Sequence, residues 1–149
     1  MADLIIVDTN VLVSALLSPR GNPSLILRMI LSESLRIVLD RRVYQEYRVV
    51  LSRPKFSFDE VRREALLTFL KNEGFWITPK PVFLEISDPS DLPFIELSLH
   101  THAPVITGNT KHYPCDLNIL TPAEFIALYR EKNLLTQQQQ QQDHTRKTG

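Results

Sequence analysis

The chain of 149 residues has few of the residues on which several protein classes depend. Its single cysteine, Cys115, excludes an internal disulfide, and we expect a small buried or half-buried thiol there. Its four glycines form no glycine-rich loop, which argues against a dinucleotide-binding domain. No apolar run approaches the roughly 20 residues that span a bilayer, and the first residues lack the pattern of a signal peptide. We therefore expect a soluble, cytoplasmic protein without a membrane partner.

An excess of either charge is also missing, since 17 basic side chains face 17 acidic ones. No overall field attracts nucleic acid, although a local basic patch remains open. The hydrophobic share of 43% suffices for one core, so we predict one folded domain over residues 1–132. The stretch "TQQQQQQDHTRKTG" offers nothing to bury, and we predict a disordered, glutamine-rich tail over residues 133–149.

What the chain does contain is an alternation of short apolar runs and helical patterns. Capping residues mark several helix starts: Asp40, the pair Ser57 and Glu60, and the pair Thr121 and Glu124. In the helix that follows Glu60, the spacing predicts a buried face that includes Val61. This alternation predicts an α/β fold around a mostly parallel sheet. The predicted strands cover residues 4–7, 35–39, 75–78, 104–108 and 117–120.

Acidic and amide side chains fall where a parallel sheet places its ligands, at the carboxyl ends of the strands. Asp8 follows the first strand, and Asn109 follows the strand that begins at residue 104. Asp88 and Asp91 open the helix before that strand, and Glu46 lies in the middle of another helix. Clustered carboxylates repel one another, and a hard cation such as Mg²⁺ or Mn²⁺ resolves that repulsion. The pattern is therefore compatible with metal-assisted phosphate chemistry.

Each of these acids also has a purely structural interpretation. Asp8 can cap the end of a strand, and Glu46 can pair with Arg42 one helical turn earlier. Asp88 and Asp91 can cap a helix. A phosphatase with a strand-end aspartate nucleophile is a further alternative, but it needs a second aspartate where Asn10 stands.

Five segments in order give the chain a family resemblance. They are "IIVDTNVLVSALLSPRGNPSLILR", "VYQEYRVVLSRPKF", "SDPSDLPFIELSL", "PVITGNTKHY" and "ILTPAEFIALY". Together they resemble the PIN-domain family, in particular its branch of toxin components from toxin–antitoxin systems, over about residues 3–130. The resemblance implies a three-layer α/β/α fold with a mostly parallel central sheet. It also implies a metal-dependent ribonuclease that uses Mg²⁺ or Mn²⁺.

The resemblance also implies roles for individual residues. The family's three acids match Asp8, Glu46 and Asp91 as catalytic and metal-binding residues. Thr9, Asn10, Asp88 and Thr107 match supporting positions. At the fourth metal position relatives often carry Thr-Gly-Asp, whereas this chain has Asn109, which keeps an oxygen ligand but loses the charge.

Partners follow from the same resemblance. RNA is the implied substrate, and a small antitoxin protein and a second copy of the chain are implied partners. Arg20 and Lys111, which both follow strand-end loops, are the preferred cations for RNA; Arg42, Arg48, Arg53 and Lys55 are further candidates. The neutral Asn109 leaves open an alternative function, a weakened PIN domain that binds RNA or protein without cleaving it.

Overall fold

Five parallel strands form one sheet in the computed structural model, which describes residues 2–114 and 116–148. The spatial order is β3-β2-β1-β4-β5, so β1 lies in the centre. Asp3 pairs with Leu35 on one side of β1, and Ile6 pairs with Val105 on the other. Cys115 lies outside the described residues. The strands are β1 Asp3–Val7, β2 Leu35–Leu39, β3 Phe75–Trp76, β4 Val105–Ile106 and β5 Ile119–Leu120.

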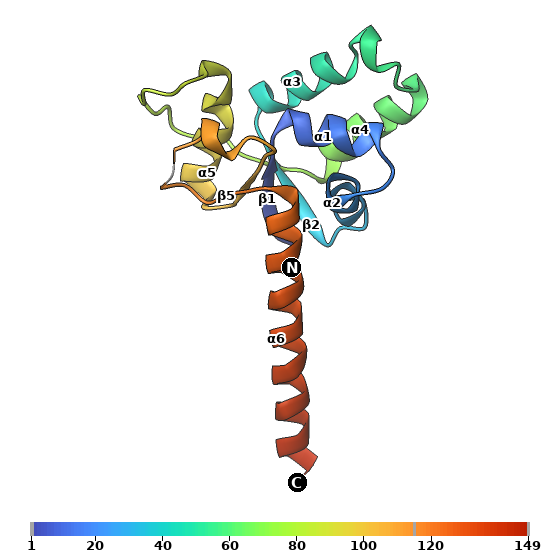
Figure 1. Ribbon diagram of the computed structural model, residues 1–149, viewed down its shortest axis with the longest axis vertical. Helices are drawn as coiled ribbons and strands as arrows, with labels where there is room; N and C mark the ends of the chain where they lie inside the picture. Colours follow the sequence, from blue (N-terminus) through green and yellow to red (C-terminus); the bar gives the residue numbers. More distant parts are fainter. Residues whose placement is uncertain (1, 115, 149) are drawn as a thin grey trace.

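Helices cover both faces of this sheet, which confirms the α/β/α prediction. Figure 1 shows α5 on one side of the central strands and α2 on the other. α2 and α4 contact β2, whereas α5 contacts β1 and β4. The α-helices are α1 Thr9–Leu17, α2 Asn22–Leu31, α3 Arg41–Leu51, α4 Glu60–Glu73, α5 Leu92–Thr101 and α6 Pro122–Thr148. Three short 3₁₀ helices are η1 Pro54–Phe56, η2 Pro89–Asp91 and η3 Thr110–His112.

The centre of the sheet is the most buried part of the domain. Ile5, Ile6 and Val7 of β1 are almost fully buried because helices cover both of their faces. All strands are parallel, so the ends of β1, β2 and β4 meet at one edge of the sheet. We call this edge, at which Asp8 follows the central strand, the carboxyl edge.

Two helix caps form as predicted, and one does not. The Asp40 carboxylate accepts a hydrogen bond from Val43 N at 2.9 Å. At α6, Thr121 and Glu124 exchange hydrogen bonds of 3.0 and 3.1 Å. The prediction for Ser57 is wrong, because Asp59 caps α4 by accepting from Arg62 N.

The predicted buried face of α4 is also partly wrong. Val61 is 77% exposed, whereas Leu66, Leu67 and Leu70 are buried. These three leucines lie at positions i, i+1 and i+4, which form one stripe on a helix. Val61 precedes this stripe in the first turn of α4, so its side chain gains no partner from the core.

The C-terminal segment is a helix rather than the irregular tail that its composition predicts. α6 runs without interruption to Thr148 and extends away from the rest of the domain (Figure 1). Every described side chain from Arg130 to Arg146 is exposed. Glutamine, leucine and lysine are good helix formers, so local hydrogen bonds can form here without a packed partner. The domain boundary at residue 132 stays a prediction.

Within the described ranges, no helix is both long and apolar enough to cross a membrane.

Candidate active site

Asp8 lies at the centre of the carboxyl edge and is fixed by hydroxyl groups. Thr107 Oγ1, at the end of β4, donates to Asp8 Oδ2 at 2.7 Å. Tyr113 Oη donates to the same oxygen at 3.4 Å. Asp8 Oδ1 caps α1 by accepting from Asn10 N, also at 3.4 Å. The strand-end cap considered from the sequence is therefore real, but it uses only one carboxylate oxygen.

The Asp8 carboxylate carries its charge without a basic neighbour. It is only 8% exposed, and no lysine, arginine or histidine in residues 2–114 and 116–148 forms an ion pair with it. A buried carboxylate is costly unless a positive charge or several hydrogen bonds compensate it. Two hydroxyl donors and the backbone N–H of Asn10 supply part of this compensation, and no ion pair adds to it within the described residues.

Glu46 reaches the same region from α3. The Thr9 hydroxyl, one residue after Asp8, donates to Glu46 Oε2. The next residue, Tyr47, is fully buried and donates to Val7 O at the end of β1. These two contacts fix the middle of α3 against the end of the central strand, and they explain why an acid in the middle of a helix lies at the carboxyl edge.

The pairing of Glu46 with Arg42 does not occur. Arg42 instead forms ion pairs of 2.6 Å with Asp40 and with Glu96 of α5. Both of these acids are buried and attract the guanidinium more effectively than Glu46 does, because their charges have lost water. Arg42 is thus an internal counter-ion, which weakens its candidacy as an RNA contact.

Asp91 completes a group of three interacting acids. It lies at the junction of η2 and α5. Burial raises the pKa of Asp91 to about 6; the negative charges of Asp8, Asp88 and Glu46 add to this effect, and the charge of His112 opposes it. Burial and the same acidic surroundings also raise the pKa of Tyr113 well above its ordinary value. Tyr113 therefore keeps its proton and remains a donor to Asp8.

The oxygen atoms at this site are chemically suited to a hard divalent cation, but the acids do not converge as closely as bound ligands do. Carboxylate and hydroxyl oxygens are the ligands that Mg²⁺ and Mn²⁺ prefer. Asp8, Glu46 and Asp91 are close enough to influence one another electrostatically. Nevertheless, no three acidic, histidine or cysteine side chains of the described chain converge closely enough to hold an ion. Mutual repulsion between bare carboxylates favours such a separation.

Two further predicted residues, Asp88 and Asn109, have local hydrogen-bond partners. Asp88 caps η2 by accepting from Ser90, and these hydrogen bonds lower its pKa. Asn109 is exposed, and its backbone N donates to Thr107 Oγ1 at 3.1 Å.

The two preferred cations differ in their positions. Lys111 is exposed in η3, two residues after Asn109. Arg20 follows the far end of α1, so that the nine-residue helix, about 13 Å long, separates it from Asp8. Lys111 is thus the nearer of the two in sequence to a residue of the candidate site.

Tyr113 and Tyr47 are the residues that the sequence did not assign to the site. Tyr113 is 105 positions from Asp8, and only the three-dimensional fold brings them together. An available signal was the position of Tyr113 shortly after the strand that ends with Thr107. Tyr47 lay in an apolar helical pattern and gave no separate signal.

A parallel sheet between two helical layers, with interacting acids at its carboxyl edge, defines an α/β/α domain whose candidate site lies at the strand ends. Among domains of this class, the family model described as "PIN domain" matches residues 4–111, and the chain belongs to this family. PIN domains as a family are nucleases that use divalent metals. The chain is also 28% identical over 137 residues to the uncharacterized protein MJ1680 of Methanocaldococcus jannaschii, covering 82% of this chain and 88% of that protein.

Proposed function

We propose that this protein is a metal-dependent endoribonuclease whose active site is formed by Asp8, Glu46 and Asp91. The observation that carries the proposal is the uncompensated negative charge at the carboxyl edge. Asp8 is buried without an ion-pair partner in the described chain, and burial together with the charges of Asp8, Asp88 and Glu46 raises the pKa of Asp91 to about 6, although the charge of His112 opposes this shift. Repulsion between these acids does not stabilise the domain. A divalent cation bound between them would replace the repulsion by attraction.

In this proposal Asp8, Glu46 and Asp91 hold Mg²⁺ or Mn²⁺, with Asn109 as a neutral ligand. The bound ion supplies activation of water and neutralisation of charge on the phosphodiester. Thr107 and Tyr113 fix Oδ2 of Asp8, and Oδ1 accepts only the 3.4 Å hydrogen bond from Asn10 N, so that its remaining lone pair can bind the ion.

Two further contributions come from the protein itself. Thr9 orients Glu46 through its hydroxyl donor. Asp91 must lose its proton before it binds a cation, so metal affinity increases as the pH rises through about 6.

The biological role that we propose is that of a toxin in a toxin–antitoxin pair. This assignment rests on the resemblance of the five segments to that branch of the PIN family, and it implies an antitoxin protein that covers the acidic site. Homodimer formation rests on the resemblance alone. The neutral, exposed Asn109 favours one alternative, a PIN domain that binds RNA or protein and cleaves slowly or not at all.

Cleavage of structured RNA by the full chain, with Mg²⁺, Mn²⁺ or EDTA, tests the enzymatic proposal. Asp8→Asn should reduce the cleavage rate by about a hundredfold or more, because it removes the central charge of the metal site. Asp59→Asn is a matched control, since Asp59 only caps α4 and asparagine caps equally well. Cleavage that persists in EDTA, or an Asp8→Asn protein as active as the control, would contradict the proposal.

A further inference from the structure

A cavity lies at the part of the carboxyl edge where Asp40 follows β2. It encloses about 610 Å³ between the ends of β2 and β3 and the loop over residues 77–88. Its wall includes Leu92, which follows Asp91, and Arg42, which lies one helical turn before Glu46. The cavity and the acidic site thus share two helices, α3 and α5, although none of the three acids lines the cavity itself.

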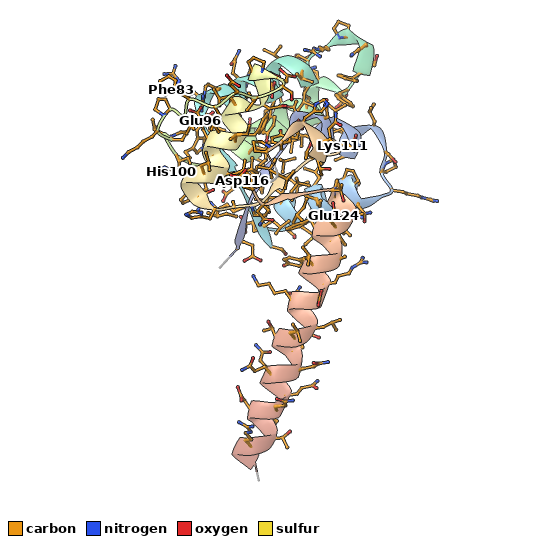
Figure 2. All side chains as sticks on the ribbon, turned by 60° about the vertical axis from the view of Figure 1, so that its left-hand side comes forward. Phe83, Glu96, His100, Lys111, Asp116 and Glu124 are labelled. Atoms are coloured by element: carbon orange, nitrogen blue, oxygen red, sulfur yellow. The ribbon has the colours of Figure 1, made fainter. Side chains whose placement is uncertain are left out.

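Exposed aromatic rings line this cavity. Trp76 is 40% exposed, and its ring is fixed because the indole N–H donates to Lys71 O at 2.8 Å and the ring packs against Tyr44. Phe83 is 96% exposed, at the outer edge of the molecule in Figure 2. A phenylalanine in water contributes nothing to the core, so an exposed ring beside a cavity indicates a binding surface.

The loop that carries Phe83 is tied to the core by a buried ion pair. Glu96 of α5 is 3% exposed; its Oε2 accepts from Val82 N at 2.7 Å, and its Oε1 pairs with Arg42. Val82 precedes Phe83, so this contact holds the backbone of the loop next to Phe83, on the side of the domain that also contains Glu96 (Figure 2).

The rim of the cavity is basic. Arg41, in the first turn of α3, lines the cavity, is exposed and has no ion-pair partner within the described part of the chain. Lys80 is exposed between the lining residues Pro79 and Pro81, but does not itself line the cavity; it is also without an ion-pair partner within the same ranges. The two acids beneath, Asp40 and Glu96, already share Arg42. A cation beside exposed aromatic faces is the combination that binds a phosphate and its stacked base.

We propose that this cavity binds one unpaired nucleotide of single-stranded RNA, with the base against Trp76 and Phe83 and a phosphate at Arg41. The inference rests on the proposed ribonuclease function and names the part of the substrate that lies beside the cleaved bond. Single-stranded RNA is required because the faces of paired bases in a duplex are covered by their neighbours. The site selects unpaired segments without reading a particular sequence.

Trp76 is the single tryptophan of the chain, so its fluorescence reports on this cavity directly. The full chain in EDTA is titrated with a short oligouridylate and, separately, with a blunt RNA duplex, so that no cleavage interferes. We expect saturable quenching by the single strand and little change with the duplex. Binding of the oligouridylate without any change in Trp76 emission would overturn the inference.

Variants then assign the quenching to the proposed contacts. Phe83→Ala should weaken oligouridylate binding about tenfold, and Arg41→Ala should also reduce the salt dependence of binding. Leu84→Ala is the matched control, since Leu84 is exposed on the same loop but does not line the cavity. If Phe83→Ala and Leu84→Ala have equal effects, or if Phe83→Ala binds the oligouridylate as the wild type does, the nucleotide site is overturned. A protein partner would then be the occupant to test for this cavity.

The Mn²⁺-dependent cleavage assay separates this inference from the proposed function. RNA cleavage that depends on Asp8, combined with binding that ignores Phe83 and Trp76, overturns the inference and leaves the nuclease intact. Quenching that depends on Phe83, combined with no cleavage under any metal, supports the nucleotide site and overturns the enzymatic proposal.

Discussion

Replacing Asp91 by asparagine removes one of three interacting negative charges at the carboxyl edge. Asp91 has a pKa of about 6 in the folded protein against 3.8 in an ordinary environment, because burial and the charges of Asp8, Asp88 and Glu46 oppose its ionisation. Between these two pH values the folded chain binds more protons at Asp91 than the unfolded chain does. The free energy of unfolding therefore falls as the pH rises from about 4 to about 6, and it stays low above that range.

The size of this effect follows from the shift in proton affinity. A tenfold change in that affinity corresponds to about 1.4 kcal/mol, which sets an upper bound of about 3 kcal/mol for Asp91. Asp91 is only partly buried, so solvent screening reduces the expected gain of Asp91→Asn at pH 8 to about 1 kcal/mol. For a domain of this size that gain raises the melting temperature by about 3 °C.

The assay is thermal unfolding of the wild-type protein, Asp91→Asn and the control Asp59→Asn, in EDTA, from pH 4 to pH 8. Asp91→Asn should be the more stable protein at pH 8, and its advantage should vanish near pH 4. Added Mn²⁺ should raise the melting temperature of the wild type more than that of Asp91→Asn. An advantage that is independent of pH, or a variant less stable than the wild type at pH 8, would refute the electrostatic reasoning.

Three other changes have defined outcomes. Asn109→Asp should lower the Mn²⁺ concentration at half-maximal cleavage and raise the rate; no effect on either quantity places Asn109 outside the metal site. Tyr113→Phe should slow cleavage a few-fold by removing one donor to Asp8, and an unchanged rate would show that Thr107 alone orients the carboxylate. Deleting residues 137–149 should leave melting temperature and cleavage unchanged, since their described side chains are exposed; a drop of several degrees would show that this part of α6 is packed in solution.

Most of the sheet could be predicted from local patterns because its strands are short apolar runs between caps. Asp40 and the pair of Thr121 and Glu124 act through neighbours three residues away, so their roles are visible in the sequence alone. The buried face of α4 was harder to predict. Val61 and Leu66 have similar hydrophobicity, and only the position of β2 decides that the latter is buried.

For the candidate site too, contacts between neighbours in the sequence could be predicted and contacts between distant residues could not. The strand-end position of Asp8 and its cap on α1 follow from adjacent residues. The partner of Arg42 does not, since Glu96 is 54 positions away and competes with the local Glu46 for the same guanidinium. The spacing of residues in the sequence cannot show that a distant buried acid pairs with the arginine in preference to a nearby half-exposed one. That preference depends on how much water each acid loses in the folded chain.

Two groups of acids lie at the carboxyl edge, and in the described chain only one of them has an arginine that compensates its charge. Asp40 and Glu96 are buried around one guanidinium, which accepts both of them at 2.6 Å. Asp8, which follows the neighbouring strand, is also buried, but its donors are two hydroxyl groups and one backbone N–H, while Glu46 and Asp91 add charge of the same sign. The fold can thus place an arginine beside buried acids at this edge, and it does so for one group. The other group keeps an excess of acidic side chains that a divalent cation can balance, which is the physical basis for proposing the metal at Asp8.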